Sequence, residues 1–168
     1  MTAENTLIDI GSTGREIGVD LSFNNSDTTL LDLGAGILLS RTSSGGIAAD
    51  IDIDSSVIKI RRNRWELSPA SLHLEKRLYT ADSIRLLSYS DTLLISGAIS
   101  EDPDRQLNVK LGNLDMSILN SFMETDLDLG GRLSGKVELF NFFSGMGASM
   151  EVKGHDLTLL GQYLGDLS

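Results

Sequence analysis

The strongest constraint on this chain is an alternation of apolar and polar residues that recurs along most of its length. Residues 49–54 alternate strictly between an aliphatic residue and aspartate, and residues 72–75, 107–111 and 133–139 follow the same period of two. Successive side chains of a β-strand point to opposite faces. This period therefore predicts strands with one apolar and one polar face.

Clusters of Ser, Asn, Asp, Gly and Pro separate the alternating runs. They lie at residues 24–27, 43–46, 68–71, 88–91, 101–104 and 153–156. Such compositions favour turns. Turns that recur at roughly 8 to 12 residues indicate short strands that follow one another directly, so the chain is predicted to form an antiparallel meander.

One stretch breaks this rhythm. Met116, Leu119 and Met123 have nearly helical spacing, and Asp115 can cap the start of a helix. We therefore predict an all-β fold, a long antiparallel meander with one short helix at residues 115–123.

A meander with one apolar face must cover that face. It can close into a barrel, pair with a second sheet, or fold lengthwise into a trough. Only 5% of the residues are aromatic, which favours a trough or an open sandwich over a barrel filled by large side chains. The period of two does not decide between these forms.

Composition excludes several classes of protein. The net charge of -10 argues against a nucleic-acid partner and against electrostatic docking on an anionic membrane. The chain has no cysteine, which removes disulfides and thiolate sites. No apolar run is long enough to span a bilayer and no signal peptide is evident, so we expect a soluble segment.

The residues that could carry chemistry do not form a catalytic pattern. His73 falls on the polar side of its strand, and Gly34-Ala35-Gly36 lacks the third glycine of a dinucleotide-binding loop. Residues 50–54 place aspartates at alternate positions, but the glycine and the glutamate of a calcium loop are missing. Asp102-Pro103-Asp104 is typical of a turn. We expect no enzyme activity, no catalytic residue, no metal site and no cofactor.

Two further features have structural interpretations. Lys59, Arg61, Arg62 and Arg64 form the one basic cluster, which we interpret as a solvated strand end, with lipid phosphate or an acidic partner as the alternative. Trp65 is the sole tryptophan and is expected to anchor a core, or else to lie at the lip of a groove.

Several motifs resemble those of TamB-like proteins, members of the AsmA-like group. Residues 65–74 (WELSPASLHL) resemble the family's W-x-L-x-P…L-x-L segment, and residues 93–104 (LLISGAISEDPD) resemble its L-x-I-x-G-x-x-S-x-D-P-D hairpin. Residues 106–115 resemble the strand that follows, although Met116 stands where the family often has Leu, and residues 130–135 (GGRLSG) resemble its G-G-x-L-x-G step. The resemblance is clearest over residues 57–140.

The resemblance implies a periplasmic envelope protein that is anchored in the inner membrane and reaches the outer membrane. It implies a long sheet folded into an apolar-lined trough, a β-taco-like form, that takes part in phospholipid transport. The chain lacks the membrane anchor and stops at Ser168. We therefore expect residues 1–168 to be a single β-rich segment of a larger, repetitive protein.

On this hypothesis the alternating aliphatic residues solvate acyl chains. The expected lining residues are Leu67, Leu72, Leu74, Ile84, Leu86, Leu93, Ile95, Leu107, Val109, Leu111, Leu133, Val137 and Leu139. Branched aliphatic side chains give a smooth, non-directional surface, so no single one of them is expected to be essential.

Two other functions are compatible with the same residues. The chain could be a scaffold or chaperone that helps outer-membrane proteins assemble beside a barrel partner, because exposed strand edges can pair with a client strand. It could also be a purely structural β-sandwich whose leucine face is its core.

Overall fold

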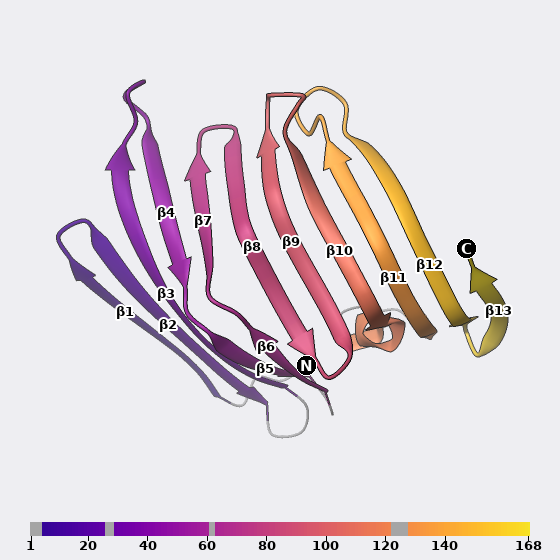
Figure 1. Cartoon of the computed structure of the whole chain (residues 1–168). Helices are drawn as coiled ribbons and strands as arrows, with labels where there is room; N and C mark the ends of the chain where they lie inside the picture. Colours follow the sequence, from indigo (N-terminus) through magenta and orange to yellow (C-terminus); the bar gives the residue numbers. More distant parts are fainter. Residues whose placement is uncertain (1–4, 26–28, 61–62, 122–127) are drawn as a thin grey trace.

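The computed structural model describes residues 5–25, 29–60, 63–121 and 128–168. Its thirteen strands belong to one antiparallel sheet, which Figure 1 shows as a broad, open and bent layer. The all-β prediction is confirmed. None of the helices in these ranges is long and apolar enough to cross a membrane.

The strands follow the alternating runs of the sequence. They are β1 (Asn5–Thr13), β2 (Glu16–Asn25), β3 (Thr29–Arg41), β4 (Ile47–Ile53), β5 (Ser56–Ile60), β6 (Asn63–Leu67), β7 (Ala70–Glu75), β8 (Leu78–Ser88), β9 (Asp91–Ser100), β10 (Gln106–Asp115), β11 (Leu129–Phe140), β12 (Gly147–Leu159) and β13 (Gln162–Leu167).

The sheet is a meander in which two long strands are each interrupted once. Ile53 of β4 pairs with Ala70 of β7, and three residues further on Ser56 of β5 pairs with Leu67 of β6, so the register continues across the gap. One long hairpin, β4–β5 against β6–β7, therefore fills the space between β3 and β8. Each remaining strand pairs with its neighbours in sequence, as the predicted meander requires.

The two interruptions line up with irregularities in the adjacent strands, and we call this line the crease. It comprises Gly34 of β3, Asp54–Ser55, Ser68–Pro69 and Asp82–Ser83 of β8. The Asp54 amide donates to the Gly34 carbonyl at 2.9 Å, and the Ser68 amide donates to the Arg85 carbonyl at 3.0 Å. Pro69 has no main-chain N–H group, so it cannot donate a hydrogen bond to a neighbouring strand. Figure 1 shows that β5 and β6 leave the crease at a different angle from β4 and β7.

The short helix is present but tighter than an α-helix. A 3₁₀ helix, η1, spans Met116–Ser121 after β10, and the Ser117 amide donates to the Asp115 carboxylate at 2.9 Å. Asp115 therefore caps the helix as predicted. Residues 122 and 123 lie outside the described ranges, as do residues 26–27 of one predicted turn and Arg61 and Arg62 of the basic cluster.

Two of the predicted turns are wrong. Residues 68–71 do not reverse the chain: they lie at the crease between β6 and β7, and both of these strands pair antiparallel with β8. Residues 153–156 lie inside β12, where the pairing with β11 shifts between Gly130 and Arg132 and Asp156 has a φ of 51°. A β-bulge, which inserts one extra residue and leaves the strand continuous, uses the same Gly and Asp residues as a turn. Composition does not distinguish the two.

The sheet buries little of its surface. The chain exposes 10996 Å², against about 8,100 Å² expected for a compact monomer of this size. Among the described residues no large side chain is fully buried, and the buried apolar side chains are Ala48, Trp65, Leu67, Ala70, Ala98 and Leu114. Trp65, at 3% exposure, is thus a core anchor as the sequence predicts.

The lower end of β9–β11 is held by one partly buried ion pair. Arg132 Nη1 lies 2.8 Å from Asp91 Oδ1 and 2.8 Å from the carbonyl oxygen of Asn113, the bulge residue of β10. The Asp91 side chain is only 10% exposed, whereas Arg132 is 44% exposed. The guanidinium therefore neutralises the aspartate and satisfies a main-chain acceptor together.

We expect Arg132→Met to lower the free energy of unfolding by about 1–3 kcal/mol, because it leaves a buried carboxylate without its partner. Urea unfolding followed by circular dichroism measures the change. Arg64→Met is the matched control, since Arg64 and Glu66 are 61% and 65% exposed, and it should alter stability by no more than about 0.5 kcal/mol. Equal effects of the two variants would contradict a structural role for the Arg132–Asp91 pair.

Candidate functional site: the apolar face of the sheet

The strand register places all thirteen predicted lining residues on one face of the sheet. Residues that are directly opposite in an antiparallel pair point to the same face. Val109 is opposite Ile95 and Val137, and Leu93 is opposite Leu86 and Leu111. Following these pairs from strand to strand assigns every member of the set to the same side. We call this side the apolar face.

The lining residues form rows that run across the strands. One row is Leu67, Leu86, Leu93, Leu111, Gly135 and Val152. The next is Ile84, Ile95, Val109, Val137 and Met150. Neighbouring strands are about 4.8 Å apart, so the first row is about 24 Å long.

Sequence reasoning missed the N-terminal third of this face. Ile17, Val19 and Leu21 of β2 lie opposite Ile37, Ala35 and Leu33 of β3, and Ile37 lies opposite Ile51 of β4. These pairs continue the same side of the sheet. Their period of two is present in the sequence, but the family motifs do not extend to these residues.

The apolar face is only partly shielded from water. Leu67 is 7% exposed and the other twelve predicted lining residues are half-buried. Toward the edges the same face is more open, with Ile8 58%, Ile10 65% and Met150 68% exposed. A closed sandwich would cover these side chains with a second sheet, and the described residues contain one sheet only.

Burial on this face is deepest beside the crease. Trp65, Leu67 and Ala70 are 3%, 7% and 6% exposed, and Ile58 lies directly opposite Trp65. The Trp65 indole nitrogen is buried without a hydrogen-bond acceptor in the described part of the chain. The side chains on the opposite face of the same strands, Arg64 and Glu66, are exposed. The sheet therefore bends toward its apolar face at this end.

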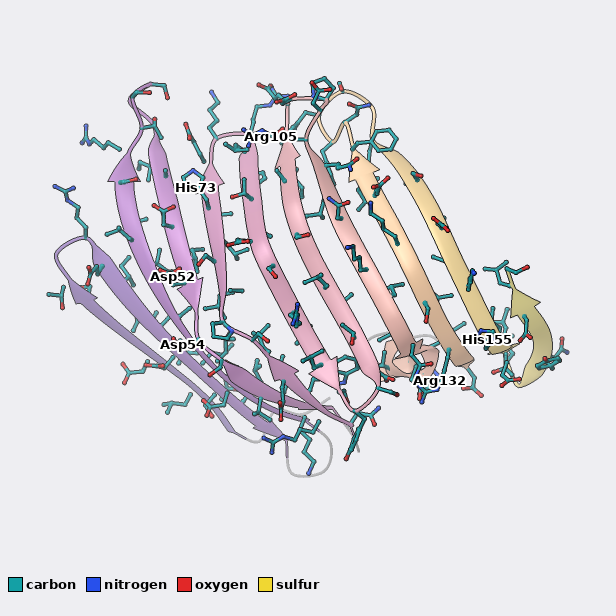
Figure 2. The ribbon with its side chains drawn as sticks, viewed as in Figure 1. Asp52, Asp54, His73, Arg105, Arg132 and His155 are labelled. Carbon is teal, nitrogen blue, oxygen red and sulfur yellow. The ribbon has the colours of Figure 1, made fainter. Side chains whose placement is uncertain are left out.

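The opposite face is polar and acidic, and Figure 2 shows its Asp52, Asp54 and His73 along β4 and β7. Asp52 lies opposite Ser71 and accepts a hydrogen bond from its hydroxyl at 2.6 Å. A shallow hollow of about 390 Å³ opens at the crease beside Asp54, Asp82 and Arg85. No group of three or more possible metal ligands occurs in the residues that the structure describes.

His73 is an ion-pair partner on the polar face. Its Nδ1 lies 2.6 Å from Asp50 Oδ1, directly across the β4–β7 pair, and its Nε2 lies 3.8 Å from Glu75 Oε2. The hydrogen bond to Asp50 raises the pKa of His73 above its usual 6.5, opposed by partial desolvation and aided by the charges of Asp50 and Glu75. The geometry joins two strands through this ion pair.

Comparison of the chain with protein-family models, with curated proteins and with solved structures gives no match. Any inference about function therefore depends on the apolar face of the sheet.

The raised pKa of His73 makes stability depend on pH. Folding favours the protonated ring, so its contribution is fully present below pH 6.5 and is lost as the pH rises through the higher folded-state pKa. We expect the urea midpoint to fall over this interval in the parent chain and to fall less in His73→Gln. Asp50→Asn, which removes the main partner, should flatten the profile in the same way. Unchanged profiles in both variants would contradict this assignment.

Proposed function

We propose that this chain is a segment of a TamB-like bridge in the periplasm, and that its apolar face shields phospholipid acyl chains in transit between the inner and outer membranes. The observation that carries the proposal is the set of aliphatic rows that cross the sheet on one half-exposed face. Soluble monomers rarely leave a contiguous apolar surface of more than a few hundred square ångströms open to water. Such a surface indicates a ligand or a partner.

The dimensions of the rows suit an acyl chain. The hydrocarbon core of a bilayer is about 30 Å thick, so the chains of one leaflet extend about 15 Å. The row from Leu67 to Val152, at about 24 Å, can accommodate that length. Each methylene group that leaves water for the face gains about 0.8 kcal/mol. Because leucine, isoleucine and valine provide no fixed polar contacts, the chain can move along the row without breaking a specific bond.

The polar face supports the same function. The chain carries a net charge of -10, and Asp50, Asp52 and His73 share the side opposite the rows. Water solvates this side while the apolar side is occupied. In this proposal the bend at the crease deepens into a trough in the full-length protein, and lipid headgroups stay at its open side.

A charge on the apolar face should abolish lipid binding. We expect native mass spectrometry to detect stoichiometric phospholipid on the gently purified parent chain and none on Val109→Arg, because the guanidinium would have to shed water beside the acyl chains. Asn108→Arg is the matched control. Asn108 is the adjacent residue of β10, is also half-buried and lies on the polar face opposite Ser96, so this variant should keep its lipid.

Circular dichroism must show that both variants remain folded. Loss of lipid in both variants alike would assign binding to net charge and not to the apolar face. A parent chain that carries no lipid, and that takes up none from added phospholipid, would overturn the proposed function.

A further inference from the structure

The Trp65 indole is a buried hydrogen-bond donor without an acceptor. The residue is 3% exposed, and among the described residues its Nε1 is the only buried side-chain nitrogen or oxygen atom without a hydrogen-bond partner. An N–H group that is buried without an acceptor loses its hydrogen bonds to water, which costs free energy. Folded proteins rarely leave such a group unpaired. The position therefore indicates an acceptor that comes from outside the described residues.

Trp65 lies on the apolar face, in the row next to Leu67. It is directly opposite Ile58, and Ile58 is directly opposite Leu31 of β3. Trp65 and Leu67 are two residues apart on β6, so their side chains point to the same side and are separated by about 7 Å along the strand. An acyl chain whose first methylene groups reach the Leu67 row therefore has its ester group beside Trp65.

Toward β8 the row of Trp65 becomes polar. The register of β6 with β8, extended by one residue beyond the pair Glu66–Leu87, places Trp65 across from Ser88. Ser88 is in turn opposite Asp91, and these two residues are 4% and 7% exposed. The row thus changes from aliphatic to polar at Trp65. A lipid changes in the same way where its acyl chains join the glycerol group.

The burial of the donor favours a neutral acceptor. A phosphate oxygen would have to give up the water around its charge to approach the Trp65 ring, which is costly unless a cation compensates. The guanidinium at this end of the sheet, that of Arg132, already binds Asp91 at 2.8 Å. The carbonyl oxygen of an ester carries no net charge and accepts a hydrogen bond without this cost.

We infer that the Trp65 indole N–H donates a hydrogen bond to an ester carbonyl of the phospholipid, so that the apolar face selects ester-linked over ether-linked chains. This inference rests on the proposed lipid function. The ring is covered in the lipid-free chain, but Ile58 and Leu86 on the neighbouring strands are half-buried, so they can move aside as the ester group approaches. An ether-linked lipid has no carbonyl to offer the donor.

The sole tryptophan makes this hydrogen bond directly observable, because the nitrogen-15-labelled chain has a single indole N–H resonance. We expect dihexanoyl phosphatidylcholine, added below its micelle-forming concentration, to move the indole proton downfield. Dihexyl phosphatidylcholine, its ether-linked counterpart, should leave this proton nearly unshifted. The ester lipid should bind about tenfold more tightly, which corresponds to one hydrogen bond to a buried donor.

Two variants separate the donor from the packing of the ring. Trp65→Phe keeps an aromatic ring and removes the N–H, so it should bind both lipids with equal affinity, as measured from main-chain amide shifts. Leu114→Val is the matched control. Leu114 is 8% exposed and lies on the apolar face opposite Leu133, so this variant loses buried volume but no donor and should keep the preference. If Trp65→Phe does not fold by circular dichroism, the indole resonance of the parent chain still decides.

Equal affinities and equal indole shifts for the two lipids would overturn the inference and leave lipid binding by the apolar face intact. An indole proton that is already hydrogen-bonded in the lipid-free chain would overturn it as well, because the donor would then have its acceptor without the ligand. If neither lipid shifts any resonance of the apolar face, the proposed function fails and this inference fails with it.

Discussion

The register of the hairpins is the constraint on which the rest of the structure depends. Side chains alternate between faces, so a slip of one residue in any hairpin would move the apolar residues of every later strand to the polar side. Two-residue turns prevent this slip at several positions, for example between Thr13 and Glu16 and between Glu75 and Leu78. Gly14, the first central residue of its turn, has the positive φ that a type II′ turn requires, 68°. Arg77, the second central residue of the other turn, has a φ of 57°.

The bulges preserve this constraint while they bend the sheet. Ala81 and Ile84 both lie on the apolar face although they are three residues apart, because the bulge at Asp82–Ser83 inserts one extra residue. Leu111 and Leu114 have the same relation across the bulge at Asn113. The sheet can thus change direction without moving an aliphatic residue to the polar face. Because each bulge adds one residue, the sheet can curve and still keep its apolar and polar side chains on separate faces.

An open apolar face and marginal burial are two consequences of the same architecture. A single layer covers each side chain only with its neighbours in the layer, so the lining residues stay half-buried. Stability then depends more on the continuous main-chain ladder and on local contacts such as the Arg132–Asp91 pair. A second layer would add buried area, but it would also close the surface that the proposed lipid function requires.

The amino-acid sequence is sufficient to predict the all-β class, the antiparallel meander and which aliphatic residues within a strand share a side. The period of two is a local property, so it assigns Leu93 and Ile95 of one strand to the same side. The register between strands is what places Val109 and Val137 on that side as well. Where the strands break and bend depends instead on tertiary pairing. Residues 153–156 have the composition of a turn and form a bulge, and the crease at Asp54–Ser55 and Ser68–Pro69 interrupts two strands without ending their pairing. Whether a Gly, Asp, Ser or Pro residue ends a strand or only bends it depends on the strand beside it, because the partner's hydrogen bonds determine whether the ladder continues.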